Sequence, residues 1–120
     1  MKLVYIAGPF TAPNAWAIEQ NVRKAEEAGL WVAEHGAMPI ISHANTRFFT
    51  GLCTPEFWYA GTMELLRRCD GIMLLPNWEL SHGAFREAGE AERLRLKVWD
   101  YARFLYREDL PERFREWAGT

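Results

Sequence analysis

Glu87 is the residue of this sequence best suited to chemistry, because of its place in the stretch ELSHGAFREAGEAE. Ala84, Ala88 and Ala91 follow one another at offsets of four and three, which is the spacing of one buried helical stripe. Glu87 borders that stripe, and Gly83 lies one turn earlier on the same side. Since glycine has no side chain, a ligand could meet the carboxylate there. The alternative is an ordinary solvated glutamate on a helix surface.

Ser81 and the amides around Gly83 form a second group with chemical potential. The start of a helix presents unpaired N–H groups and the positive end of the helix dipole, which together bind anions such as phosphate. A serine in this place is equally typical of a plain N-cap, whose oxygen accepts a hydrogen bond from its own first turn. The sequence leaves both interpretations open.

The elements that must position these residues follow from hydrophobic patterning. Apolar runs bounded by turn residues predict four strands, which are KLVYIA, AMPIISH, GIMLLP and a weaker KVWDY. Helical spacing and capping residues predict helices over residues 18–36, 54–68 and from Ser81 or Gly83 onward, and a last short helix that begins at Pro111. Strand and helix alternate, so we expect an α/β fold: a three-layer, doubly wound sandwich with a mostly parallel sheet of four to five strands, flavodoxin- or Rossmann-like, in the order 2-1-3-4.

A ligand site on such a sheet has a defined place. Ligands bind beyond the carboxyl ends of the strands where the strand order reverses, here between the first and third strands. The residues expected at this rim are Gly8, Pro9, Phe10 and Thr11 after the first strand, His43 and Asn45 after the second, and residues 77–81, including Trp78, after the third. Phe10 and Trp78 either hold a flat ring between them or cover the end of the sheet. Asp70 enters the third strand at the opposite edge, where we expect it to cap or orient a turn.

Composition narrows the class of protein. With 120 residues the chain is expected to form one domain, residues 1–120, and its formal net charge of −2 argues against a nucleic-acid polymer or an anionic membrane as partner. No apolar run is long enough to cross a bilayer and no signal peptide is evident, so we expect a cytoplasmic protein. Cys53 and Cys69 lie in unrelated contexts and are expected to be reduced thiols. No Cys or Asp cluster accompanies His43 at ligand spacing, so we expect no metal and no cofactor.

Three stretches carry a family resemblance. VYIAGPF, PIISHANTRFFTG and ELLRRCDGIMLLPNWELSHGAFREAGEA occur in this order over roughly residues 3–98. Together they resemble the nucleoside 2-deoxyribosyltransferase superfamily, in particular its small bacterial and phage branch, which is related to nucleotide N-glycoside hydrolases. The resemblance implies the same α/β fold.

The resemblance also implies roles for the residues above. In such enzymes the glutamate of a Gly-x-x-x-Glu element attacks the anomeric carbon of the sugar, and this position is Glu87. The carboxylate would stabilise an oxocarbenium-like transition state and trap it as an ester, as in a retaining glycosidase. Ser81, six residues earlier, resembles the phosphate-contacting serine of the nucleotide hydrolases. Residues 8–11 resemble the segment that flanks the nucleobase and sugar, and His43 with Asn45 occupies the rim.

One position departs from the family pattern. Eight residues before the aspartate that opens the third strand, the family usually has an aspartate that assists the leaving base, and this chain has Thr62. A threonine is not a general acid at neutral pH. Glu64 is about 200° further around the helix and should face elsewhere. Glu56 lies nearer the rim and is a hypothetical substitute proton donor, although an acid in a first helical turn is also explained by the dipole.

These interpretations converge on a function. We expect an enzyme, a deoxyribosyltransferase or nucleotide N-glycosidase, that cleaves or exchanges the N-glycosidic bond of a nucleoside or its 5′-monophosphate. Its partners would be that small molecule and further copies of the chain in a homodimer or higher homo-oligomer. The alternative is a non-catalytic module on the same fold that binds a nucleotide, and Thr62 is the residue that most favours it.

Overall fold

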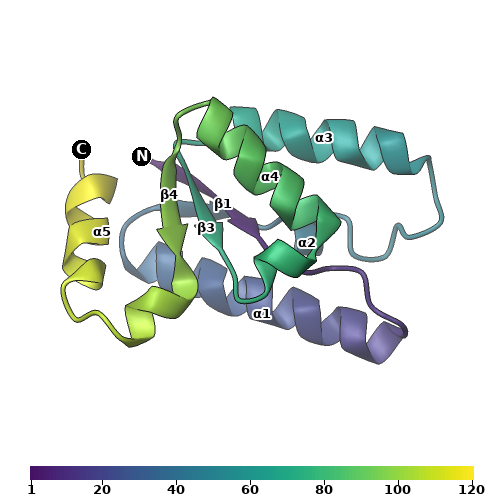
Figure 1. Ribbon diagram of the computed structural model, residues 1–120, viewed down its shortest axis with the longest axis horizontal. Helices are drawn as coiled ribbons and strands as arrows, with labels where there is room; N and C mark the ends of the chain where they lie inside the picture. The colour runs from purple at the N-terminus through teal and green to yellow at the C-terminus, as the bar shows by residue number, and fades with distance from the viewer.

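A four-stranded parallel sheet forms the middle layer of the computed structural model, which describes residues 1–120 (Figure 1). The order is β2-β1-β3-β4, as predicted. The strands are β1 (Leu3–Ala7), β2 (Met38–Ile40), β3 (Gly71–Leu74) and β4 (Lys97–Asp100). The register pairs Tyr5 with Ile40 on one side and with Ile72 on the other. The order reverses between β1 and β3, which places the topological switch point there.

Helices cover both faces of the sheet. In Figure 1, α1 (Ala15–Glu34) lies on one side, and α3 (Pro55–Arg67) and α4 (His82–Arg93) lie together on the other. The shorter elements are α2 (Ser42–Asn45), η1 (Trp78–Leu80), η2 (Tyr101–Leu105) and α5 (Leu110–Ala118). Side chains alternate along β1, so that Val4 and Ile6 join the core under α1 and α5 while Tyr5 and Ala7 join the core under α3 and α4. The chain is therefore a three-layer α/β sandwich.

Side-chain caps start the helices where the sequence predicts. The Thr54 hydroxyl accepts a hydrogen bond from the Phe57 N–H at 3.2 Å, and Pro55 occupies the first turn of α3. Ser81 is the N-cap of α4 and accepts from the Ala84 N–H at 3.3 Å. Gly36, with φ of 99°, directly follows the C-cap of α1, where a left-handed residue ends a helix most easily. These caps fix the ends of α3 and α4 that border the site.

The second strand is shorter than predicted. AMPIISH was expected to be extended throughout, but β2 ends at Ile40, and Ser42 and His43 lie in α2. The physical reason is that the Ser42 and His43 side chains contact Tyr5 and the carbonyls after β1, which a continued strand would not allow. Two smaller differences are that α1 begins at Ala15, capped by Asn14, and that the expected loop after β3 contains η1. The sheet has four strands and no fifth.

The aromatic C-terminal segment belongs to the core. Phe114 of α5 is fully buried and packs against Trp31 and Trp99, with ring centroids 5.1 Å away in both cases. Trp117 lies over Gly71, where an added Cβ would come within 2.7 Å of the indole. The segment therefore packs on the sheet. Asp70 also has its predicted structural role, because its carboxylate accepts a hydrogen bond from the Leu3 N–H at 2.8 Å.

Candidate functional site

A cavity of about 530 Å³ opens at the switch point of the sheet. Its wall is made by the chain after β1, α2, the segment between α2 and α3, one side of α3, and the first turns of α4. The volume suits a small organic ligand. The predicted site residues that line it are Gly8, Phe10, Thr11, His43, Thr62, Ser81, Gly83 and Glu87.

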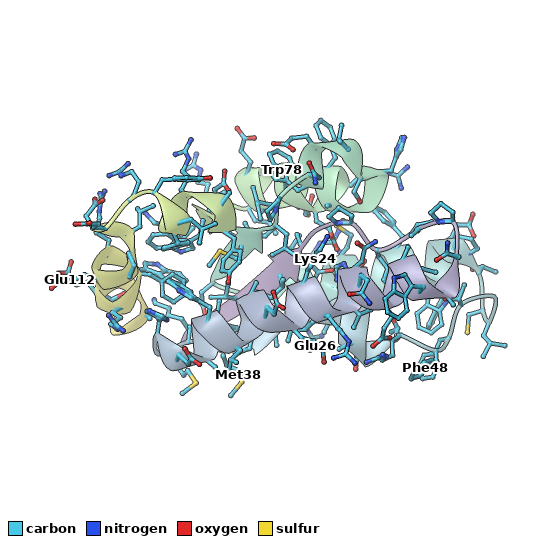
Figure 2. All side chains as sticks on the ribbon, turned by 90° about the horizontal axis from the view of Figure 1, so that it is seen from below. Lys24, Glu26, Met38, Phe48, Trp78 and Glu112 are labelled. Carbon is cyan, nitrogen blue, oxygen red and sulfur yellow. The ribbon has the colours of Figure 1, made fainter.

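Four other predicted site residues do not line the cavity. Pro9 contributes only its carbonyl, which accepts from His43, and Asn45 is exposed on α2. Trp78 lies on the α4 side of the molecule (Figure 2), stacked on Phe85 over the core. Trp78 therefore covers the end of the sheet and does not clamp a ring against Phe10. Glu56 is exposed in the first turn of α3, a place that the helix dipole explains, so the structure does not bring the hypothetical proton donor to the cavity.

Glu87 is buried, with 8% of its surface exposed. The sequence predicted that Glu87 borders the buried stripe of α4 without belonging to it, and this is wrong: Glu87 is buried together with Ala84 and Ala91, because this side of α4 packs against β1 and β3. No cation pairs with the carboxylate, and its Oε2 accepts a hydrogen bond from the Tyr5 hydroxyl. Burial raises the pKa of Glu87 to about 7, although the hydrogen bond from Tyr5 lowers it. Glu87 therefore has the features of a functional carboxyl group.

Tyr5 is a residue of this site that the sequence did not reveal. Its ring is fully buried in β1, and its hydroxyl oxygen lies 2.9 Å from the Ser42 Oγ. Burial, and then the charge and hydrogen bond of Glu87, raise the pKa of Tyr5 well above its usual range, while the hydrogen bond with Ser42 acts in the opposite direction. In an apolar run such as KLVYIA, the tyrosine cannot be told apart from an ordinary core residue. The available signal was the alternation of side chains along the strand, which puts Tyr5 and Ala7 on the face of β1 that α4 covers.

His43 is held by the chain after β1. Its Nε2–H donates to the carbonyls of Gly8 and Pro9, both at 3.1 Å, and the Phe10 ring meets it edge-on at 5.5 Å. Burial lowers the pKa of His43 although these carbonyls act in the opposite direction, so the ring is neutral and its Nδ1 is a buried acceptor without a partner. No group of three or more His, Cys, Asp or Glu side chains is placed to hold a metal ion.

At the start of α4, the structure is compatible with both interpretations of Ser81, as an N-cap and as part of an anion site. Its oxygen caps the Ala84 N–H, and the residue also lines the cavity. No atom lies within 4 Å of the position that a Cβ on Gly83 would occupy, so the backbone there is open to a ligand. A hydroxyl and helix amides beside a cavity can bind an anionic group.

An aromatic wall from the start of α3 and the segment before it lines the cavity, and the sequence did not reveal it either. Phe49 and Trp58 stack with ring centroids 5.8 Å apart and an interplanar angle of 28°, and Tyr59 completes the wall. Flat apolar faces of this kind suit a planar ring. The signal was the aromatic density of the stretch RFFTGLCTPEFWY, which crosses the predicted loop and the start of α3.

This sheet order and helix arrangement define a nucleoside deoxyribosyltransferase-like fold. The solved structure of a 2-desoxiribosyltransferase from Leishmania mexicana is similar to this chain, with a TM-score of 0.51 and 24% sequence identity over 83% of the chain. The match covers 63% of that enzyme, so the chain spans less than two thirds of its length.

Within this fold class, the chain belongs to the family described as Domain of unknown function (DUF4406), whose sequence model matches residues 2–100. A search of the curated proteins gave no match. Among the helices, none combines the length and the apolar composition that crossing a membrane requires.

Proposed function

We propose that this protein cleaves or exchanges the N-glycosidic bond of a nucleoside or a nucleoside 5′-monophosphate, with Glu87 as the nucleophile. The observation that carries the proposal is a buried carboxyl group, unpaired with any cation, in a cavity at the switch point of the sheet. Glu87 is the only acidic residue among those that line this cavity. The similarity in fold to a 2-desoxiribosyltransferase supports glycosyl transfer as the class of reaction.

The reaction would proceed in two displacements at the anomeric carbon. A Glu87 carboxylate oxygen forms a bond to C1′ while the C1′–N bond breaks, and its electron pair leaves with the nucleobase, which takes up a proton. A water molecule or a second base then attacks C1′, loses a proton, and returns the electron pair of the ester bond to the carboxylate. Water gives hydrolysis, and a second base gives transfer.

The rest of the cavity supports the two ends of such a substrate. Phe49 and Trp58 offer flat faces to a nucleobase, and Ser81 with the amides around Gly83 offers donors to a 5′-phosphate. We propose these as binding residues together with Thr11 and His43. Thr62 also lines the cavity and supplies a hydroxyl where the nucleoside 2-deoxyribosyltransferase superfamily usually has an acid. Departure of the base would therefore rely on the polarity of the site rather than on a carboxylic acid.

The test is product analysis on a panel of nucleosides and their 5′-monophosphates, each with and without a second free base. We expect base release from at least one substrate, and a loss of about a thousandfold or more in Glu87→Ala. Glu92→Ala is the matched control, because Glu92 is exposed on the same helix. Equal turnover of the two variants, with equal near-UV spectra, would show that the carboxyl group of Glu87 is not the nucleophile.

A second candidate is a nucleotide-binding module without turnover, which Thr62 favours because the cavity then lacks an acid for the leaving base. Calorimetry that detects tight binding of a monophosphate, with no base released over a day by chromatography, would select this alternative. We expect the opposite result.

We also propose that the chain forms a homodimer or higher homo-oligomer. Aromatic side chains near the cavity are exposed, with Phe48 at 79%, Phe57 at 58% and Phe85 at 59%. In Figure 2, Phe48 projects from the surface near the start of α1. Exposed aromatic side chains of this size are typical of surfaces that bind other proteins. Light scattering coupled to gel filtration measures the mass, and a monomer at all concentrations would contradict the proposal.

A further inference from the structure

Three side chains from three different elements form a continuous hydrogen-bonded chain at the cavity. Ser42 opens α2, Tyr5 lies in the central strand β1, and Glu87 lies in α4. The Ser42 Oγ is 2.9 Å from the Tyr5 hydroxyl, which in turn bonds to the Glu87 Oε2. All three residues are buried, so water does not compete for these bonds.

The direction of these bonds follows from counting protons. A phenol has one hydrogen to donate, and an ionised carboxylate has none. When Glu87 is in its nucleophilic form, the Tyr5 O–H must therefore point at Glu87. The Tyr5 oxygen is then left as an acceptor, so Ser42 is the donor of its bond to Tyr5. The order of donation is Ser42 to Tyr5 to Glu87.

We propose that Ser42 is a positioning residue for the nucleophile, acting through Tyr5. This inference rests on the proposed function of Glu87. Tyr5 lies on the rigid central strand, but its O–H can rotate about the C–O bond, and the Ser42 hydroxyl fixes that rotation so that the hydrogen stays on Glu87. A phenol that accepts a hydrogen bond is also a stronger donor.

The same geometry selects which carboxylate oxygen reacts. Oε2 of Glu87 is engaged by Tyr5, whereas Oε1 accepts no hydrogen bond from the protein. Oε1 is also not among the buried polar atoms that lack a partner, so it is open to the cavity that Glu87 lines. The bond from Tyr5 therefore holds the carboxyl plane while leaving one oxygen free for C1′. Orientation of this kind is a large part of catalytic efficiency.

Thr62 adds to this interpretation. Its hydroxyl donates to the Tyr59 carbonyl at 3.1 Å, as a threonine within a helix often does, so its one hydrogen is not available to Tyr5. Thr62 therefore does not compete with Ser42 as the donor to the Tyr5 oxygen.

No charged group competes with this chain of hydrogen bonds for control of Glu87. β1 contributes only Tyr5, β3 carries no titratable side chain, and α2 contributes the neutral His43. The charged groups of α3, α4, η1 and β4 are paired with one another, stacked on aromatic rings or exposed: Glu56, Glu64, Arg67, Glu79, His82, Arg86, Glu90, Glu92, Arg93, Lys97 and Asp100. Tyr59 and Cys53 also line the cavity, and neither side chain is hydrogen-bonded to Tyr5 or Glu87.

The experiment follows the titration of Glu87 directly by carbon-13 NMR of the side-chain carboxyl groups, with the Glu87 signal identified by its loss in Glu87→Gln. Ser42→Ala should raise the pKa of Glu87 by roughly half a unit, and Tyr5→Phe by about one unit, because each removes donation toward the charged form. Ser42→Thr restores a hydroxyl and should restore the titration. Tyr101→Phe, which removes a phenol far from the cavity, is the matched control and should change nothing.

Activity provides the second readout. On the substrate with the highest turnover, the acidic limb of the kcat profile should move to higher pH in Ser42→Ala and return in Ser42→Thr, a pattern that a purely structural role of Ser42 would not give. If Ser42→Ala is folded and leaves both the titration and the limb unchanged, the positioning role is wrong. If the titration moves as expected in a protein that releases no base, the order of donation from Ser42 through Tyr5 to Glu87 stands and the proposed function is wrong.

Discussion

At the scale of single residues, the dehydration of Glu87 is the electrostatic effect that bears most directly on the proposed chemistry. The carboxyl group is 8% exposed and has one hydrogen bond and no ion pair to offset the loss of water. Its pKa is therefore raised to about 7 from an ordinary value of 4.5. A nucleophile with this pKa is available at neutral pH and is more basic than a solvated carboxylate.

The raised pKa of Glu87 makes a prediction about stability. Because the folded protein binds this proton more tightly than the unfolded chain, the cost of burying Glu87 in its ionised form is absent below about pH 4.5. The cost grows as pH rises and is complete above about pH 7, where it is on the order of 3 kcal/mol. Glu87→Gln removes the charge, so its free energy of unfolding should exceed that of the natural sequence at pH 8, and the difference should shrink toward pH 5.

Urea unfolding at the two pH values measures this difference. Glu92→Gln is the control, because an exposed glutamate should show no such pH dependence. A Glu87→Gln variant that is equally or less stable than the natural sequence at pH 8 would mean that the carboxylate is well solvated or paired, contrary to its burial.

Single residues also show where sequence reasoning ends. Glu87, Ser81 and Gly83 were predicted together, because helical spacing and capping chemistry are local and all three line one cavity. Tyr5 and Ser42 were not predicted as functional, because their importance lies in contacts across 82 and 37 positions of the chain, which no local pattern encodes. Trp78 and Glu56 were expected at the site because Trp78 follows a strand and Glu56 lies near the rim. Neither position determines whether the side chain points into the cavity, and neither side chain does.

At the scale of elements, the start of α4 combines a cap with a candidate anion site. Ser81 is the N-cap and lines the cavity. The two roles can be separated, because aspartate is as good an N-cap as serine but repels a phosphate. We predict that Ser81→Asp keeps the stability of the natural protein within about 0.5 kcal/mol and reverses its preference from monophosphates to the matching nucleosides.

Ser81→Ala provides the comparison for this prediction, since it removes the cap and should cost about 1 kcal/mol without adding a repulsive charge. Binding of a nucleoside and its monophosphate, measured by calorimetry for each variant, gives the two preferences. Equal affinity of the unmodified protein for both ligands would remove the phosphate from the proposed substrate.

Elements also differ in how well they can be predicted. The starts of α3 and α4 were correct because Thr54, Pro55 and Ser81 act within one turn. The end of β2 was wrong because Ile41 can continue a strand as readily as it can precede a helix. The side chains of Ser42 and His43 reach partners in and after β1, and these tertiary contacts decide the outcome.

At the scale of the whole molecule, the C-terminal segment ties the sheet to α1. The family match ends at residue 100, yet α5 supplies Phe114 to the core under α1, among Trp31, Trp99 and Phe104. The alternation of strands and helices predicted the sheet order, because right-handed crossovers leave few arrangements. The position of α5 does not follow from the sequence, because an aromatic helix can pack equally well on the sheet or on another subunit. We propose that residues 1–120 form one cooperative domain that includes this segment.

Phe114→Ala tests that proposal. The ring is fully exposed on unfolding and fully buried in the native state, so its loss should lower the free energy of unfolding by about 3–5 kcal/mol through lost burial and the cavity left behind. If the segment and the sheet unfold together, the near-UV signal of the aromatic cluster and the far-UV signal of the helices should share one midpoint in both proteins, shifted to lower denaturant in the variant. Leu80→Ala is the control, because Leu80 is 83% exposed and its loss should change the midpoint little. Two separate midpoints, or a Phe114→Ala variant as stable as the Leu80→Ala control, would place α5 outside the cooperative unit and would leave the sheet with α1, α3 and α4 as the domain.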